Sequence, residues 1–587
     1  MQQAQVLSDT YNKIMKQQST APFEKQIRVI VFGILFCFGC IGGMLWYLQL
    51  YQAALFTQVS QNNYMRKRTL SCRRGAITDR NGILIATDRP IIALYWQGCG
   101  CKKLSEQHQK LLAHIQAESN QKLPIARTIT QAEQYQQKLL LVDNISFEAL
   151  ARIMEYNNAD EHLIIETRPL RYYPHQETAC HLIGCFRQTP QTTIPEALMG
   201  LEKILEEDLR GNPGLEEIIV DSRGRCITKN IRFQALNGTK ITTTIDLLAQ
   251  NIAEKLLAPF RAGTIIVMDP EQGDLLVLAS HPSFDPNIFT STISPETWNN
   301  YLATKPFINR AIASCYPPAS LFKLITAAAA LEEGIITPDT EWNCTGKIVC
   351  GDTEFHCNKR YGHGKLQIID GIAHSCNIPF YEIGKTISID LFADYARSFG
   401  FGKPTGILLP ERTGLIPTSE WKKTTTGQRW QRGETMLVAI GQSYSLVTPL
   451  QTVCFIGALG SGRLVRPKIL CNENTNITPL AISNETRNIL LQGMQKGIEQ
   501  GTSRLLKRLK NCTIYGKTGT AQVCSKKTSG ENQEEEAYKN HGWFAGYIVP
   551  HNQKPFVLMV FLENIGTSSI AVQTAYKFLH HWLPKTM

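Results

Sequence analysis

The feature that most constrains the fold is an unbroken run of twenty uncharged residues at positions 29–48, rich in Phe, Leu and Ile. An apolar helix of about 20 residues is long enough to cross a bilayer. Four Lys or Arg residues precede the run, and the next one after it is Arg66. Because positive charge is retained on the cytoplasmic side, we expect residues 1–28 in the cytoplasm and the rest of the chain outside it.

Two other interpretations of this run are a buried core helix and a cleaved signal peptide. The sequence after the run offers no persuasive small-residue cleavage site, which favours an uncleaved signal anchor. In a cell with an outer membrane, a single-pass anchor in the inner membrane places everything after residue 48 in the periplasm.

The composition is that of a folded, multidomain protein. A length of 587 residues is enough for two or three domains, and a content of 43% hydrophobic and 19% charged residues is ordinary for globular proteins. A net charge of +11 is compatible with nucleic-acid binding, but no basic cluster with interleaved aromatic residues is present. We therefore expect no nucleic-acid partner, and an anionic wall polymer or membrane surface instead. The seventeen cysteines have no regular small-scaffold spacing, so no disulfide pairing is predicted.

A second apolar segment begins at Pro317-Pro318 and predicts a buried helix from about Ala319. Ser320 lies in its first turn, and Lys323, three residues later, lies on the same face. A serine beside a lysine is a nucleophile beside a base if burial or a neighbouring cation keeps the amine neutral. The same spacing recurs at Ser419 and Lys422, where we expect no apolar helix to bury the lysine, so this second pair is the weaker candidate.

Two further motifs follow Ser320 in the chain, Ser375-Cys376-Asn377 and Lys517-Thr518-Gly519-Thr520. Ser-x-Asn alone is weak, since Ser60 begins a second copy, but Lys-Thr-Gly occurs once. The alternation around Lys517 predicts a strand over residues 516–523 that lines an active site. The three motifs in this order are typical of penicillin-binding proteins and β-lactamases.

Other stretches carry the resemblance further. Residues 74–82 predict a strand and an Asn-Gly turn, and they resemble the opening motif of the class B penicillin-binding proteins. Tyr173-Pro174 and residues 181–184, 200–203, 210–214 and 221–225 resemble the non-catalytic pedestal of that family, so the resemblance covers nearly the whole chain.

This resemblance implies an α+β protein with a single N-terminal transmembrane helix, an elongated α/β pedestal and a penicillin-binding domain whose central antiparallel sheet is flanked by helices. The expected boundaries are 1–28 for a cytoplasmic tail, 29–48 for the anchor, 49–240 for the pedestal (dimerisation) domain and 241–587 for the transpeptidase domain. The sheet should contain strands near 264–268, 275–279, 516–523, 542–549 and 556–562, with a closing helix over 570–579. Polar helices are expected over 104–161. Residues 525–540 should form a solvated loop, or one that overhangs the Lys517 strand.

The resemblance also implies a reaction. Ser320 would attack the penultimate D-Ala carbonyl of a peptidoglycan stem peptide, expel the terminal D-Ala and pass the acyl group to the amine of a neighbouring strand. Lys323 would accept the Ser320 proton, and Ser375 and Asn377 would hold the second amine and relay the proton. Lys517 would keep Lys323 neutral and, with Thr518, Gly519 and Thr520, bind the substrate carboxylate. The backbone N–H groups of Ser320 and Thr520 would bind the oxyanion.

A Cys and His cluster stands between the serines, namely Cys344, Cys357, His363 and Cys376. Three thiolates and one imidazole suit a closed, structural zinc site. Gly362-His363-Gly364 resembles the penicillin-binding protein 2 branch, in which some members hold zinc through carboxylate, His and Cys ligands. Here cysteines replace the carboxylates. The alternatives are a Cys344–Cys357 disulfide or free thiols, with Cys350 and His356 as substitute ligands.

The expected function is that of a serine-type D-Ala-D-Ala transpeptidase of cell-wall elongation and cell-shape maintenance, acylated by β-lactams, with carboxypeptidase activity as a side reaction. A membrane-embedded glycan polymerase of the shape-elongation-division-sporulation family is the expected partner, since no polymerase module precedes residue 240. Alternatives are a division-type (septal) transpeptidase, a penicillin sensor or scaffold without transfer activity, and a β-lactamase. The pedestal argues against the last, and the single span argues against a sensor.

Overall fold

The computed structural model describes residues 2–17, 21–156, 162–188, 195–221, 226–291, 293–522 and 540–583. Its contacts divide the chain into two compact units, one of residues 1–71 and 213–236 and the other of residues 72–212 and 237–587. The expected loop at 525–540 lies, apart from Asn540, outside the described residues.

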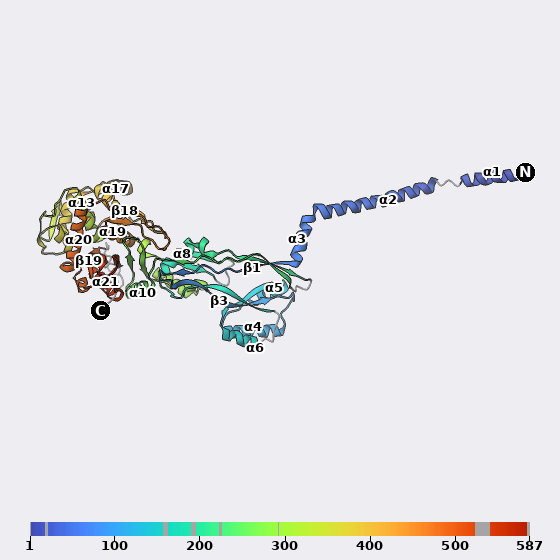
Figure 1. The fold of residues 1–587 in the computed structure, drawn as a ribbon, viewed down its shortest axis with the longest axis horizontal. Helices are drawn as coiled ribbons and strands as arrows, with labels where there is room; N and C mark the ends of the chain where they lie inside the picture. Colours follow the sequence, from blue (N-terminus) through green and yellow to red (C-terminus); the bar gives the residue numbers. More distant parts are fainter. Residues whose placement is uncertain are drawn as a thin grey trace. The chain divides into compact units, whose positions relative to one another are not determined.

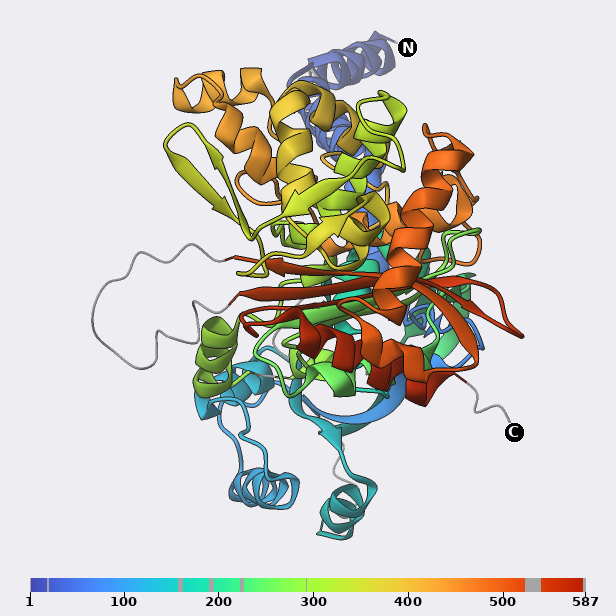
Figure 2. The same cartoon turned by 90° about the vertical axis from the view of Figure 1, so that its left-hand side faces the viewer.

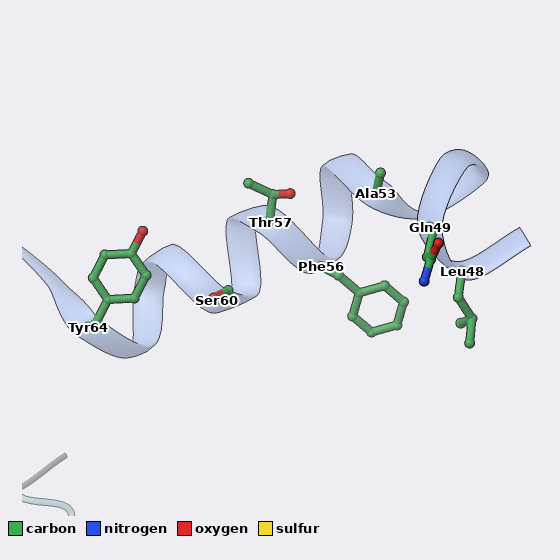
Figure 3. A pocket seen from close by; sticks show the side chains of 7 residues that line it. All are labelled: Leu48, Gln49, Ala53, Phe56, Thr57, Ser60 and Tyr64. Carbon is green, nitrogen blue, oxygen red and sulfur yellow. The ribbon is translucent and has the colours of Figure 1, made fainter. Parts of the chain in front are cut away.

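The first unit contains the apolar run. Helix α1 (Gln2–Gln17) is followed by α2 (Ala21–Trp46), a π-helical turn η1 (Tyr47–Tyr51) and α3 (Ala53–Tyr64), drawn in blue in Figure 1. Within the described residues, one helix is long and apolar enough to cross a membrane, Lys25–Tyr51, with a mean hydropathy of 2.3. An open hollow of about 600 Å³ lies where η1 meets α3, and Figure 3 shows the side chains that line it, from Leu48 to Tyr64. Strands β1 (Met65–Leu70), β8 (Gly214–Val220) and β9 (Cys226–Phe233) form an antiparallel sheet in that order.

The second unit begins with the pedestal portion, residues 72–212. Its sheet has the order β10-β2-β3-β4, with β5 also paired to β3. These strands are β2 (Ile77–Thr78), β3 (Leu84–Gln97), β4 (Lys138–Ile145), β5 (Leu163–Tyr172) and β10 (Ile241–Thr242). Strands β2 and β3 pair antiparallel across a turn at residues 80–81, which confirms the hairpin expected from Asn81-Gly82.

Three helices of the pedestal portion, α4 (Glu106–Ser119), α5 (Ala126–Gln134) and α6 (Phe147–Tyr156), lie in the region where polar helices were expected. Each buries a narrow apolar stripe, such as Leu111 and Ile115 of α4, in a core around Trp96. Strand β4 lies between α5 and α6 and was not expected. Short elements complete this portion, namely α7 (Cys180–Ile183), β6 (Cys185–Arg187), β7 (Glu196–Met199), α8 (Gly200–Ile204) and α9 (Glu206–Arg210).

Buried ion pairs join pedestal motifs that lie far apart in the sequence. The fully buried carboxylate of Glu202 accepts hydrogen bonds from Arg74 Nε at 2.6 Å, from Arg171 Nε at 2.7 Å and from Tyr173 Oη at 3.1 Å. A buried charge must be paired to be tolerated, so these residues depend on one another.

The remainder of the second unit contains a five-stranded antiparallel sheet of order β12-β11-β21-β20-β19. The strands are β11 (Gly263–Met268), β12 (Leu275–His281), β19 (Cys512–Ala521), β20 (His541–Pro550) and β21 (Phe556–Leu562). All five expected strands are present. Strand β19 begins four residues earlier than the predicted residue 516.

Helices cover both faces of this sheet, as Figure 2 shows. On one face, α10 (Leu247–Leu257) and α21 (Ser568–Trp582) bury Ala253, Leu257 and Phe578 against alternate strand residues. On the other face lies a helical layer that includes α13 (Phe322–Glu332) and α19 (Pro449–Ser461).

The other elements of the catalytic domain surround this helical layer. The helices are η2 (Pro286–Thr290), α11 (Pro295–Thr304), α12 (Arg310–Ala313), η3 (Ala319–Leu321), α14 (Ile368–Ala373), α15 (Ile378–Thr386), α16 (Ile389–Ser398), α17 (Ser419–Thr426), α18 (Arg432–Ala439), α20 (Asn484–Glu499) and η4 (Arg504–Arg508). Small two-stranded antiparallel sheets are formed by β13 (Trp342–Cys344) with β16 (Gly364–Leu366), β14 (Lys347–Cys350) with β15 (Thr353–His356), and β17 (Arg463–Val465) with β18 (Ile477–Pro479).

Candidate active site

Ser320 lies in a 3-10 turn, Ala319–Leu321, that leads directly into α13. The sequence predicted an α-helix from Ala319, and the structure begins the α-helix three residues later. Ala319 has φ = 50°, a left-handed conformation that costs a residue with a side chain about 1–3 kcal/mol unless its surroundings hold it. Two contacts hold this turn: Ala319 N–H donates to Gly441 O at 2.9 Å, and Trp543 Nε1 donates to Pro317 O at 3.1 Å.

Lys323 follows one turn after Ser320, and its side chain is completely buried. Its amine lies 2.7 Å from Ser375 O, 2.7 Å from Asn377 Oδ1 and 3.3 Å from Ser375 Oγ. Burial lowers the pKa of Lys323 to about 8, although the thiolates of Cys376 and Cys357 oppose the shift. A neutral amine can donate to the two close oxygens and keep its lone pair to accept a proton.

The segment that carries Ser375 and Asn377 is held rigidly beside this amine. Ser375 is buried with φ = 55°, which is the second strained backbone position next to Lys323. The Asn377 side chain is fixed at both ends, because Oδ1 accepts from Lys323 and Nδ2 donates to His356 O at 2.9 Å.

Strand β19 supplies Lys517, Thr518, Gly519 and Thr520. A Cβ on Gly519 would lie 3.3 Å from Pro318 O and 3.4 Å from Ala319 Cβ, so this strand packs directly against the turn that carries Ser320. Lys517 is buried, and its pKa is well below the ordinary value, first because of burial and then because of the positive charge of Lys323. The charge of Lys323 therefore disfavours the ammonium form of Lys517.

Threonines and a glutamine complete this edge of the strand. Thr518 Oγ1 lies 2.7 Å from Thr502 Oγ1, and Gln442 Nε2 donates to Thr520 O at 3.2 Å. The structure thus brings together segments near residues 320, 375 and 517, which are far apart in the sequence. The sequence predicted that the Lys323 amine lies beside Ser320, and in the structure its hydrogen bonds go to Ser375 and Asn377.

The weaker pair, Ser419 and Lys422, has different surroundings. Its own helix, α17, is polar as expected, but Lys422 is nevertheless only 2% exposed. Its amine pairs with Glu434 Oε1 at 2.5 Å, and Ser419 Oγ donates to Asp390 Oδ2 at 2.6 Å. Both side chains of this pair are therefore bonded to carboxylates.

Sequence reasoning missed Gly441, Gln442 and Trp543, which shape the site. A Cβ on Gly441 would lie 2.0 Å from Ala319 O, so only glycine permits this approach. The sequence signal for Gly441 is its place just after α18, where glycine commonly ends a helix. Trp543 looks like an ordinary strand residue, and no local signal distinguishes it.

The four predicted metal ligands, Cys344, Cys357, His363 and Cys376, converge, with all their ligand atoms within 4.8 Å of one another. Nδ1 of His363 lies 3.6 Å from Cys344 Sγ and 3.5 Å from Cys357 Sγ, and Cys357 Sγ lies 3.7 Å from Cys376 Sγ. Tetrahedral zinc with bonds of about 2.3 Å to sulfur and 2.05 Å to nitrogen requires about 3.8 Å between sulfurs and about 3.6 Å between sulfur and nitrogen. The set therefore has the dimensions of a zinc site.

Two of the alternatives for this cluster do not match the structure. Cys344 and Cys357 form no disulfide with each other, and neither Cys350 nor His356 belongs to the converging group, so free thiols are the alternative to a metal site. The pKa of Cys357 is lowered to about 4, chiefly by a hydrogen bond from Cys376, whose own pKa is raised by the same contact. These opposite shifts favour a thiolate at Cys357 and a thiol at Cys376.

Comparison with known families identifies this arrangement. The model of the penicillin-binding protein transpeptidase domain matches residues 263–580, which is more than half of the chain. The chain belongs to the penicillin-binding protein transpeptidase family. The model of the penicillin-binding protein dimerisation domain matches residues 69–243. Both domains of the expected α+β fold are thus confirmed.

Relatives of this penicillin-binding protein span nearly its full length. The peptidoglycan D,D-transpeptidase MrdA of Acinetobacter baumannii is 29% identical over 97% of this chain and 88% of its own length. The MrdA of Escherichia coli is 26% identical over 96% of this chain and 94% of its own length. The structure of penicillin-binding protein 2 (PBP2) in complex with MreC from Helicobacter pylori superposes with a TM-score of 0.75 at 25% identity, covering 88% of this chain and 99% of that one. The expected resemblance to the penicillin-binding protein 2 branch is confirmed.

Proposed function

We propose that this penicillin-binding protein is a peptidoglycan D,D-transpeptidase that cross-links stem peptides during cell-wall elongation, and that β-lactams acylate it at Ser320. The observation that carries the proposal is the convergence of the Ser320 turn, the buried amine of Lys323 and strand β19 in one pocket. Its resemblance to proteins named D,D-transpeptidase supports the same conclusion.

In the acylation step, Ser320 Oγ attacks the carbonyl carbon of the penultimate D-Ala while its proton passes to neutral Lys323. The oxyanion is held by the backbone N–H groups of Ser320 and Thr520. Lys517, Thr518 and Thr520 bind the terminal carboxylate, and the tight packing of Gly519 against Pro318 keeps this strand close to the nucleophile. The proton on Lys323 then moves through Ser375 to the leaving amine, and D-Ala departs.

In the transfer step, the amine of a neighbouring stem peptide attacks the Ser320 ester. Its proton moves through Ser375 to Lys323 and then back to Ser320 Oγ, so the enzyme is regenerated. Water in place of the amine gives the carboxypeptidase side reaction. Asn377, anchored at Lys323 and at His356 O, keeps this relay in place.

The elongation role and the partners are part of the proposal. The helix Lys25–Tyr51 anchors the enzyme in the inner membrane, with the catalytic domain in the periplasm. A membrane-embedded glycan polymerase of the shape-elongation-division-sporulation family supplies the glycan strands. The structural relatives include a PBP2 in complex with MreC and a peptidoglycan synthase complex that coordinates polymerisation with cross-linking. A scaffold of the MreC kind is therefore a second expected partner.

Labelling with a fluorescent penicillin tests the nucleophile. The parent protein and a Ser419→Ala variant should be labelled equally, and Ser320→Ala should show no label. Persistent label in Ser320→Ala would refute the assignment. Release of D-Ala together with cross-linked product from a polymerised glycan substrate separates the transpeptidase from a penicillin sensor, which would be labelled without forming cross-links.

We further propose that Cys344, Cys357, His363 and Cys376 hold a structural zinc ion. The spacing of their ligand atoms, including 3.7 Å between the sulfurs of Cys357 and Cys376, supports this. Bound there, zinc would fix the Cys376 backbone, and with it Ser375 and Asn377 on either side. It supplies no step of the reaction.

Metal analysis of the purified protein tests the zinc proposal. We expect about one zinc per chain in the parent and in Cys350→Ser, a cysteine outside the cluster, and a large loss in Cys357→Ser. Chelation should lower the melting temperature of the parent. A parent protein without bound zinc would end this proposal.

A further inference from the structure

A cavity of about 790 Å³ lies between the pedestal portion and the catalytic domain, which belong to the same compact unit. One wall is formed by residues 181, 198–200, 203 and 204, and the other by residues 307–309, 312–316, 409, 410 and 412. Its volume is in the range of small-molecule binding sites, about 300–1,000 Å³. Neither the acylation machinery nor the Cys and His cluster uses these residues.

The chemistry of the lining favours an anionic ligand with an apolar body. Met199, Phe307 and Leu409 contribute apolar surface, and none of the described residues that line the cavity is Asp or Glu. Two cations, Lys203 and Arg412, belong to the lining and are exposed to solvent. Neither has an ion-pair partner in the part of the chain that the structure describes, whereas the buried arginines nearby are paired with carboxylates.

Asn309 gives a second, independent indication of a ligand. This residue lines the cavity and is 8% exposed. Its Oδ1 accepts from Ala311 N–H at 3.2 Å, but its buried Nδ2 has no hydrogen-bond partner among the described residues. An unpaired buried donor is costly. Nδ2 is closed off from solvent, so the amide must turn toward the cavity for an acceptor oxygen on a ligand to satisfy it.

The cavity also adjoins the segment that leads to the nucleophile. Tyr316 lines it and stands four residues before Ser320. Tyr316 exchanges two backbone hydrogen bonds of 2.9 Å with Val447, and its hydroxyl donates to Glu563 Oε1 at 2.6 Å. These bonds make the segment from Tyr316 to Ser320 rigid. A ligand that displaces Tyr316 would therefore also displace the Ser320 turn.

We propose that this cavity binds a small amphiphilic carboxylate that carries a second acceptor, such as an amide carbonyl, in its apolar body. The carboxylate pairs with Lys203 and Arg412, the carbonyl accepts from Asn309 Nδ2, and the apolar part packs against Phe307 and Leu409. Occupancy changes the rate at which Ser320 is acylated.

Photocrosslinking locates the ligand. The full-length protein in phosphatidylcholine nanodiscs is irradiated with 4-benzoylbenzoate, which has a carboxylate, a ketone and an apolar body, and adducts are mapped by peptide mass spectrometry. We expect adducts within residues 198–204, 307–316 or 409–412. Uncharged 4-methylbenzophenone should give few adducts there. Hippurate, which has an amide carbonyl, should displace the probe better than 4-phenylbutyrate, which lacks one. Adducts spread evenly over the chain would overturn the proposal.

Variants separate this site from non-specific binding. Lys203→Glu combined with Arg412→Glu should reduce these adducts at least about tenfold, as expected for lost hydrogen bonds to a charged group. Lys423→Glu, the control, reverses the charge of one exposed lysine of α17 and should leave the number of adducts at the cavity unchanged. Asn309→Asp keeps the acceptor for Ala311 but loses the donor, so it should also reduce adducts. Equal labelling of all these variants would contradict the site.

The rate of acylation by fluorescent penicillin tests the coupling. Saturating hippurate should change this rate at least about twofold in the parent. It should leave the rate unchanged in the double variant, which excludes competition at Ser320 itself. The same rate with and without hippurate in the parent would overturn the coupling.

Discussion

The amine of Lys323 donates to Asn377 Oδ1 at 2.7 Å, and the same asparagine donates from Nδ2 to His356 O at 2.9 Å. These two bonds tie the base of the active site to the backbone residue next to Cys357. The position of the Lys323 amine is therefore coupled to the geometry of the Cys and His cluster, so a substitution that changes one should also change the other.

Acylation should depend on pH through Lys323. Burial lowers the pKa of this amine to about 8, and the amine accepts a proton only when it is neutral. The second-order rate constant for acylation by a penicillin should therefore fall by about tenfold per pH unit below pH 8 and level off above it. Stopped-flow measurements between pH 6 and 9.5 test this. A flat profile, or a rise that continues to pH 9.5 without levelling off, would contradict the assignment of Lys323 as base.

Asn377→Asp should move this profile to higher pH. A carboxylate in place of the amide favours the charged form of Lys323, so the pKa of the amine should rise by about 1–3 units and acylation at pH 7 should slow accordingly. Asn377→Ala removes the same hydrogen bond without adding charge and serves as the control. The acylation rate constant of this variant should be lower throughout the pH range, but the midpoint of its pH profile should not move to higher pH. Identical profiles for the two variants would show that the charge of Lys323 does not limit the reaction.

Gly441→Ala should impair acylation without unfolding the protein. The new Cβ would lie 2.0 Å from Ala319 O, so the Ser320 turn must shift, and a misplacement of about 1 Å can cost about a hundredfold in rate. Gly427 has a similar φ of 71°, and a Cβ added there would meet no heavy atom within 4 Å. Gly427→Ala should therefore lose about 1 kcal/mol of stability and no activity. Penicillin acylation rates of the two purified variants make the comparison, and equal rates would contradict the role of Gly441.

Glu434→Gln should separate stability from activity. The change leaves the charge of Lys422 buried without a counter-charge, which should cost about 1–3 kcal/mol. The melting temperature should fall, while acylation per folded molecule stays that of the parent. Glu354→Gln, which breaks an exposed pair with Lys347, should leave the melting temperature close to that of the parent. A loss of acylation in Glu434→Gln beyond the loss of folded protein would mean that Lys422 has a catalytic role.

Much of the fold could be predicted because its signals are local. The strand around Lys517 alternates in the sequence, residues 556–562 form a short continuous apolar run typical of a buried strand, and the apolar run at 29–48 has the length of a membrane span. Strand β4 was missed because its neighbours are polar helices that bury only narrow stripes, so its own apolar residues looked like part of a helix.

The convergence of the site could be inferred only from motif order, because no local pattern sets the distance between Ser320 and Lys517. The environment of Lys422 shows the limit of such reasoning. Its burial depends on Glu434 and on the aromatic rings of Trp430 and Tyr444, which lie on other segments. The strained turn at Ala319 was likewise not predictable, since it depends on the absence of a side chain at Gly441.

The central claim is that Ser320 is the residue that becomes acylated. Digestion of the penicillin-treated protein followed by peptide mass spectrometry tests it most directly. The account predicts one stoichiometric penicilloyl adduct, on the peptide that contains Ser320, and none on the peptide that contains Ser419. An adduct on any other residue, with the Ser320 peptide unmodified, would contradict it.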